Sequence, residues 1–123
     1  MTGDSKVFID EKYIPLSLLY QNQVQYLNKP IMTVNLSDMR IGVSGFLSIE
    51  KHDVHNKSCY KIKAGDYSII SPYIFDEKFL IILKNGVAKR IKIDDIRETK
   101  VKFIYLIRVD DENKPIVNGV VIK

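Results

Sequence analysis

The chain has 123 residues, of which 46% are hydrophobic and 28% are charged, and its formal net charge is +4. This composition is too apolar for a disordered chain, and the length allows one ordinary domain with a buried core. No apolar run approaches the roughly 18 residues of a membrane span, and the first ten residues lack the apolar segment of a signal peptide. The only cysteine, Cys59, excludes an intramolecular disulfide. We therefore expect a cytoplasmic protein without a membrane partner.

Short apolar or alternating runs predict strands along most of the chain. The first two, at 7–9 and 12–14, flank Asp10-Glu11 as the arms of a short hairpin. The Asn85-Gly86 pair predicts a type I′ turn between two later strands, because both central positions of that turn need positive φ. Gly119 is expected to form a bulge in the last strand. The remaining predicted strands are 31–36, 45–50, 67–70, 79–83, 87–93, 100–109 and 115–122.

One stretch, residues 15–28, departs from the strand pattern. Its apolar residues recur at near-helical spacing, and Pro15 could occupy a first helical turn. The spacing predicts one short helix near 16–27, with two strands joined at Gln21-Asn22 as the alternative. The predicted fold class is therefore all-β, with one short helix.

Two parts of the chain are similar at a constant offset of 57 residues, as from Asp38 to Asp95. Arg40 and Arg97 correspond in the same way, and apolar positions stay in phase between the two copies. A mostly β repeat of this size is typical of a propeller-like blade or a small sheet. We predict a single compact domain, 1–123, built from two related antiparallel units, 7–63 and 64–123.

Residues 64–122 show an ordered series of turns and strands. An acidic turn (76–77) precedes an apolar strand (79–83), the turn Lys84-Asn85-Gly86, the pair Lys89-Arg90, the segment 94–97, a strand (103–109), an acidic turn (110–113) and a closing strand (117–122). This order resembles a blade of the C-terminal β-pinwheel of the DNA gyrase or topoisomerase IV A subunit. The resemblance implies a blade-like sheet that contacts DNA. The basic, glycine-rich box that marks DNA wrapping in gyrase is absent, so wrapping is not implied.

A basic sheet face provides the candidate nucleic-acid-binding residues. By strand alternation, Arg90 and Lys92 share one side of their strand, and Lys100, Lys102 and Arg108 share one side of the next. A line of cations can follow a duplex backbone without reading its sequence. The alternative is a solvated face whose lysines protect a sheet edge. The complete set is Lys84, Lys89, Arg90, Lys92, Lys100, Lys102 and Arg108.

The segment "HDVHNKSC" contains four residues of metal-ligating type, His52, Asp53, His55 and Cys59. A structural zinc site normally uses two separated pairs of ligands, and the chain has no other histidine or cysteine. We therefore interpret this segment as a polar turn and predict neither a metal site nor a cofactor.

Catalytic patterns are weak in this sequence. A nucleophile–base pair would have to use His52 or His55, and no third group is evident. The Asp residues at 38 and 95 each follow a predicted strand and precede another, which favours turns capped by these side chains. We predict no catalytic residues and no enzyme activity.

These observations lead to two functional hypotheses, both non-catalytic. The preferred one is a small accessory protein that binds duplex DNA through the basic sheet face. The alternative is a protein-interaction or assembly module, which docks on a larger partner or self-associates as a homo-oligomer. Two repeat units leave open sheet edges that such an interaction would cover.

Overall fold

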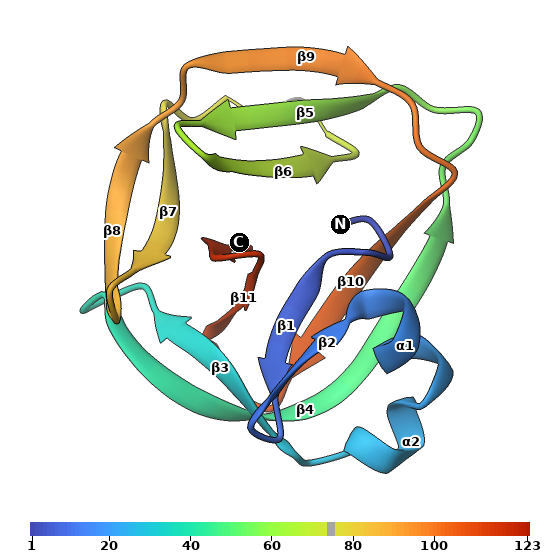
Figure 1. Ribbon diagram of the computed structural model, residues 1–123, viewed down its shortest axis with the longest axis vertical. Helices are drawn as coiled ribbons and strands as arrows, with labels where there is room; N and C mark the ends of the chain where they lie inside the picture. Colours follow the sequence, from blue (N-terminus) through green and yellow to red (C-terminus); the bar gives the residue numbers. More distant parts are fainter. Residues whose placement is uncertain (74–75) are drawn as a thin grey trace.

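The computed structural model describes residues 1–73 and 76–123, which form a ring of strands around the two chain ends (Figure 1). The strands of the first half are β1 (Lys6–Ile9), β2 (Lys12–Pro15), β3 (Pro30–Asn35), β4 (Arg40–Asp53), β5 (Cys59–Ala64) and β6 (Tyr67–Ser71). Those of the second half are β7 (Phe79–Lys84), β8 (Val87–Lys92), β9 (Asp95–Thr99), β10 (Phe103–Val109), β11 (Lys114–Val117) and β12 (Val120–Val121). The predicted all-β class is confirmed.

Two antiparallel sheets contain these strands. The larger follows the order β10-β4-β3-β11-β12-β7-β8, and β1 joins it by pairing with β2 and β3. The smaller has the order β6-β5-β9. Strands that are distant in sequence therefore become neighbours, because β10 pairs with β4 and β9 pairs with β5.

Among the described residues, three tight turns use residues with positive φ at both central positions. Asp10 and Glu11 have φ values of 51° and 64°, and they close the predicted β1–β2 hairpin. The Asn85-Gly86 pair closes the predicted β7–β8 hairpin with φ values of 53° and 75°. The prediction of one continuous strand over 115–122 is wrong. Asn118 and Gly119, at 50° and 76°, form a third turn of the same kind and separate β11 from β12.

The expected helix near 16–27 is present as two short pieces, α1 (Leu16–Gln21) and α2 (Gln23–Tyr26). Leu16 and Leu19 of α1 are buried, whereas α2 buries no residue completely. The interruption falls at Asn22, whose φ of −117° is not helical. Neither helix in the described residues is long and apolar enough to cross a membrane.

The main hydrophobic core brings the first residues of the chain together with its centre. Met1, at 6% exposure, packs in one cluster with Phe46 and Tyr105. Val117 of β11 is buried in the same cluster. Burial of these side chains fixes the beginning of the chain against strands from its middle and its end.

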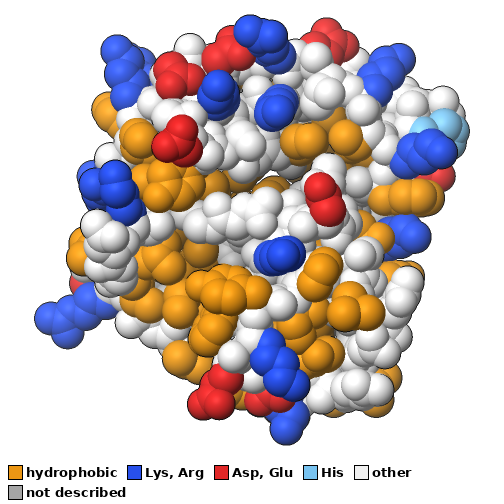
Figure 2. Space-filling view, in the orientation of Figure 1, with side chains coloured by type: hydrophobic (Ala, Val, Ile, Leu, Met, Phe, Trp, Pro, Cys, Tyr) orange, Lys and Arg blue, Asp and Glu red, His pale blue; other side chains and the backbone are white. Residues whose placement is uncertain are grey.

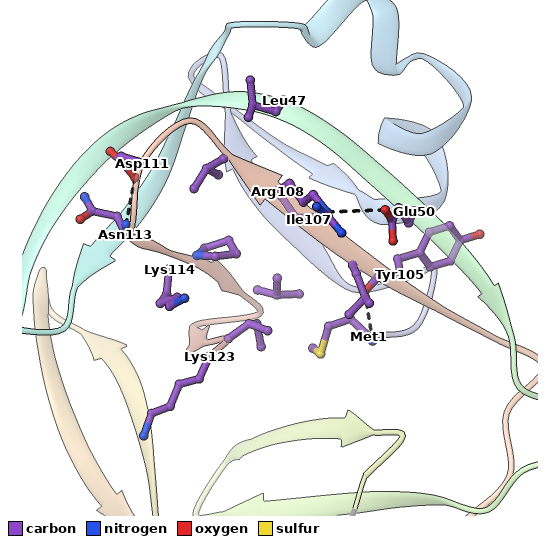
Figure 3. A pocket seen from close by; sticks show the side chains of 15 residues that line it. Met1, Leu47, Glu50, Tyr105, Ile107, Arg108, Asp111, Asn113, Lys114 and Lys123 are labelled. Carbon is purple, nitrogen blue, oxygen red and sulfur yellow. Dashed lines mark hydrogen bonds and ion pairs between the residues drawn. The ribbon is translucent and has the colours of Figure 1, made fainter.

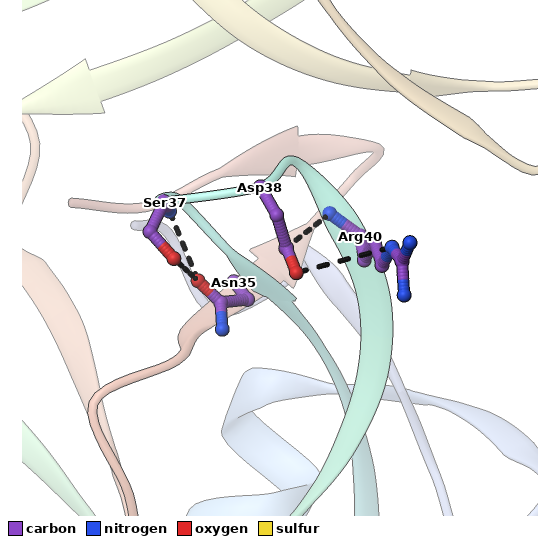
Figure 4. Close-up of polar contacts among 4 residues, drawn as sticks. All are labelled: Asn35, Ser37, Asp38 and Arg40. Atoms are coloured by element: carbon purple, nitrogen blue, oxygen red, sulfur yellow. Dashed lines mark hydrogen bonds and ion pairs between the residues drawn. The ribbon is translucent and has the colours of Figure 1, made fainter.

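The strands β5 and β9 were not predicted from the sequence. The expected Asp-capped turn at 95 is wrong, because Asp95 and Arg97 lie on one side of β9 and the Arg97 Nε donates to Asp95 at 2.7 Å. The equivalent turn at 38 is confirmed. The Arg40 N–H donates to Asp38 Oδ1 at 3.0 Å, and Asn35 accepts from Ser37 at the other side of the turn (Figure 4).

The strands β4 and β10 occupy corresponding positions in the predicted repeat, and they pair directly. Their ladder runs from Phe103 opposite Asp53 to Val109 opposite Phe46. Its middle pair is Leu106 opposite Glu50, and the next pair is Ile107 opposite Ile49. The division into 7–63 and 64–123 itself stays a prediction.

Candidate functional site

The two ends of the chain meet inside the ring of strands. Met1 and Lys123 both line a cavity of about 500 Å³, which we call the first cavity (Figure 3). They also line a neighbouring cavity of about 270 Å³, the second cavity. Leu106 of β10 and Ile122 lie between the two cavities and line both. Residues separated by the whole length of the chain are therefore next to each other.

The amino end is held by backbone pairing to β10. The Tyr105 N–H donates to the Met1 carbonyl at 2.7 Å, and the Met1 amine donates to the Tyr105 carbonyl at 3.4 Å. Desolvation by burial lowers the pKa of the Met1 amine to about 6. The environment of this nitrogen thus favours an uncharged group.

Two further contacts fix the residues that follow Met1. The Ser17 N–H donates to the Gly3 carbonyl, and the Leu16 N–H donates to the Ser5 carbonyl, which joins this segment to the start of α1. Gly3 also packs closely, because a Cβ at this position would lie 3.2 Å from Tyr105. The opening segment is consequently part of the folded core.

The carboxyl end reaches the same place through β11 and β12. The Ile122 N–H donates to the Pro115 carbonyl, and the Leu83 N–H donates to the Gly119 carbonyl. At the end of the chain the Lys123 Nζ lies 2.6 Å from Glu77 Oε2. This ion pair connects the last residue to the segment that precedes β7.

A polar network attaches the β10–β11 connection to β3 and β4. The Ser44 hydroxyl lies 2.8 Å from both carboxylate oxygens of Asp111, and the Thr33 hydroxyl is 2.9 Å from Ser44. The Gly45 N–H donates to Asp110 Oδ1 at 2.8 Å. Because Thr33 and Ser44 are buried, the bond between their hydroxyls is screened little by water. The network sets the direction in which β11 enters the ring.

The cavities offer hydroxyl, carboxylate and amine groups. In the first, Arg108 pairs with Glu50 at 3.5 Å, and Lys114 lies nearby (Figure 3). In the second, Ser71 and Glu77 share the lining with both chain ends. No histidine or cysteine lines either cavity within residues 1–73 and 76–123. Sequence reasoning did not find this site, since no local pattern indicates that the ends converge.

The seven predicted DNA-binding cations are all exposed but do not form one face. β8 and β10 lie at opposite ends of the strand order in the large sheet, so Lys89 and Arg108 are far apart in it. Arg108 is engaged with Glu50. Figure 2 shows Lys and Arg side chains dispersed over one side of the molecule, with acidic side chains among them. The physical error was to treat strands that are consecutive in sequence as neighbours in a sheet.

The candidate metal ligands do not converge. His52 pairs with Glu50 and His55 with Asp53, and all four side chains are substantially exposed. His55 lowers the pKa of the Asp53 carboxyl by hydrogen bonding to it. Cys59 is buried in a separate apolar cluster. Within the part of the chain that the structure describes, no group of three such residues could hold a metal.

The strands form a ring around the two chain ends (Figure 1), and solved structures of inteins have a similar fold. No protein-family model and no curated protein sequence matches this chain. A solved variant of the Ssp DnaB mini-intein has a TM-score of 0.76 at 15% identity, over 98% of this chain and 91% of that one. The PabCDC21-1 intein gives 0.75 at 9% identity, over 98% and 95%. The DnaX mini-intein from Spirulina platensis gives 0.67 at 16% identity, over 99% and 97%.

These likenesses correct the family resemblance drawn from the sequence. The interpretation of 64–122 as a pinwheel blade is wrong, because the solved structures that match nearly the whole chain are inteins. In the fold, β9 and β10 of the supposed blade pair with β5 and β4 from the other half of the chain. The order of turns in the sequence was similar to that of a blade, but the strand pairing is different.

The functional predictions change with the fold. Inteins are protein-splicing domains with autocatalytic activity. This contradicts the interpretation as a DNA-binding accessory protein, and the alternative of an interaction module is not supported either. The prediction that the chain is not an enzyme is wrong on the same ground.

Proposed function

We propose that this chain is an intein-type autoprocessing domain, which acts on the peptide bonds that join it to flanking polypeptide at Met1 and Lys123. The observation that carries the proposal is the position of the two ends, which line the same two cavities. A domain that excises itself has to bring its two junctions together before a new bond between the flanks can form. The intein fold supports the same conclusion.

The amino end is suited to hold a peptide bond. A residue joined to the Met1 nitrogen would convert the amine into an uncharged amide, which the buried surroundings favour. The amide would still have an N–H to donate to the Tyr105 carbonyl. Fixing the Met1 nitrogen in this way would hold the junction beside the two cavities that Met1 lines.

Ser71 is the described residue best placed to assist the reaction. Ser71 lines the second cavity together with Met1 and Lys123, and its hydroxyl is oriented by Tyr73, whose carbonyl accepts at 3.0 Å and whose N–H donates at 3.1 Å. If this hydroxyl exchanges its bond to the Tyr73 carbonyl for one to the junction, it can donate a hydrogen bond to an oxyanion that forms there. Removing one such donor typically lowers a rate by about 10²–10³.

A precursor with an unrelated folded domain at each end tests the proposal. After purification, gel electrophoresis over time should show loss of the precursor, release of the chain and appearance of the joined flanks or of separate flanks. The Ser71→Ala precursor should react about 10²-fold more slowly. The matched control is Ser37→Ala in the exposed turn at 36–39, which should react at the original rate. A folded precursor that stays intact contradicts the proposal.

The cellular compartment of the protein is also part of the proposal. We place the domain in the cytoplasm, as the sequence predicted.

A further inference from the structure

β10 lies at the end of the large sheet, and Met1 pairs with one residue on its outer edge. In the large sheet β10 is the terminal strand, and its paired neighbour is β4. On its other edge, among the described residues, Met1 is the backbone partner, through the two bonds with Tyr105. Two residues that exchange both of their backbone bonds form the hydrogen-bonded pair of an antiparallel ladder.

The direction of each backbone group along β10 follows from this pair. The Lys102 carbonyl accepts from the Val54 N–H, so even-numbered residues at the start of β10 direct their groups towards the β4 side. Tyr105 directs its groups towards Met1. Because the direction alternates along a strand, Ile107 also presents its N–H and carbonyl on the Met1 side. A register shift occurs only beyond this point, between Arg108 and Val109.

Space for another strand exists beside Ile107. The first cavity is lined on one side by β10 residues 105–109 and on the other by Lys114, Pro115 and Val117 of β11. Met1 lies at one end of this space. A polypeptide leaving the Met1 nitrogen in the direction of the existing pairing would enter the cavity along β10.

We propose that the polypeptide preceding Met1 extends β10 by strand addition, with the second residue before Met1 exchanging both backbone bonds with Ile107. The residue immediately before Met1 lies opposite Leu106 in a non-hydrogen-bonded pair. Main-chain bonds do not depend on side-chain identity, so the site accepts flanking sequences of many kinds. This inference deepens the proposed function and rests on it, since autoprocessing requires a polypeptide at this end.

Amide hydrogen exchange tests the strand addition without requiring any reaction. The full chain is compared with the same chain extended before Met1 by Thr-Val-Thr-Val, and intact mass shows that the extension is attached. Exchange of the Ile107 amide should slow by about tenfold or more on extension, as expected for a newly formed backbone bond. The Leu106 amide faces β4 and serves as the internal control, which should change by less than about twofold.

Proline scanning of the extension provides the matched pair of variants. Proline at the second residue before Met1 removes the N–H that faces the Ile107 carbonyl, and most of the protection at Ile107 should disappear. Proline immediately before Met1 removes an N–H that faces away, and protection should remain. Equal effects of the two prolines, or no protection of Ile107 on extension, would overturn the inference. If Ile107 is protected but the two-flank precursor is not processed, strand addition is supported and the proposed function is contradicted. If the precursor is processed but Ile107 is not protected, the proposed function is supported and strand addition is contradicted.

Discussion

Lys6 and Asn118, from opposite ends of the chain, are joined by two hydrogen bonds. The Lys6 N–H donates to the Asn118 side-chain oxygen at 2.7 Å, and the Asn118 N–H donates to the Lys6 carbonyl at 2.9 Å. Lys6 begins β1, and Asn118 is the first central residue of the turn between β11 and β12. The contact therefore connects the amino-terminal and carboxyl-terminal segments of the chain directly.

Replacing Asn118 should loosen this connection. In Asn118→Ala the Lys6 N–H loses its partner, which costs about 1 kcal/mol, and a left-handed φ of 50° is strained for alanine by about 1 kcal/mol more. The control is Asn85→Ala in the β7–β8 turn, where φ is 53°. Asn85→Ala should lose only the roughly 1 kcal/mol that comes from the strained backbone of the alanine. Urea unfolding measures both changes, and an equal loss of free energy in the two variants would show that the Lys6 contact contributes nothing.

Asp110 packs so closely against Gly45 that a side chain at position 45 would displace it. A Cβ at position 45 would lie 2.6 Å from Asp110 Oδ2, so in Gly45→Ala the exposed Asp110 carboxylate must turn away and lose its bond from the residue 45 N–H, which should destabilise the fold by about 1 kcal/mol. Gly42 lies on the same strand, and its nearest contact, Asn113 Nδ2, would be 3.5 Å away. We expect Gly42→Ala to be neutral or to stabilise by up to about 1 kcal/mol. Thermal unfolding of the two variants compares them, and similar melting temperatures would contradict the assigned contact.

The buried amine of Met1 should make stability depend on pH. Its pKa is about 6 in the folded chain against an ordinary 8.0, because burial penalises the charged form. Between these values the unfolded chain binds more protons, so the free energy of unfolding should rise from pH 6 to pH 8 by about 2 kcal/mol. Well above pH 8 the amine is neutral in both states, and its contribution levels off.

Acetylation of the amine is the control for this pH dependence. The acetylated chain has no titrating group at Met1, so its stability should change less between pH 6 and pH 8. Comparing the two forms isolates the contribution of the Met1 amine, because every other titratable group is common to both. If the two forms show parallel curves in urea unfolding, the amine is not desolvated as the structure indicates.

The Lys123–Glu77 ion pair should matter for processing more than for stability. Both side chains are partly exposed, at 39% and 44%, so Glu77→Gln should change the free energy of unfolding by less than about 1 kcal/mol. Because the pair positions the last residue at the second cavity, reaction at the carboxyl-terminal junction should slow, by up to about 10²-fold.

Asp95→Asn is the matched control for this variant. It removes the Asp95–Arg97 pair of β9, which is similarly short and exposed and lines neither cavity. Its precursor should react at the original rate in the gel assay. Equal rates for Glu77→Gln and Asp95→Asn precursors would exclude a positioning role for Glu77.

Local features of this fold could be predicted from the sequence. Asp10-Glu11 and Asn85-Gly86 carry turn chemistry that needs no distant partner, and the helical spacing after Pro15 is visible in a short window. In contrast, β5 and β9 have mixed apolar and charged residues, and they become strands because they pair with each other. Asn118-Gly119 has the same turn chemistry as Asn85-Gly86, but it was interpreted as a bulge within one strand.

The candidate site could not be predicted in the same way. It depends on the pairing of Met1 with Tyr105 and of Lys6 with Asn118, which are separated by most of the chain. Periodicity reports which face of a strand is buried but not which strand lies beside it. The same limit explains why cations on β8 and β10 were assigned to one face although the sheet separates them.

Intact mass spectrometry of the two-flank precursor tests the central claim most directly. If the two ends form an autoprocessing site, incubation of the folded precursor should release a species with the mass of residues 1–123, 14.2 kDa, together with the joined flanks. That mass would assign both broken bonds, one before Met1 and one after Lys123. A precursor that keeps its full mass while circular dichroism shows it folded, or that is cut only at other bonds, would contradict the account.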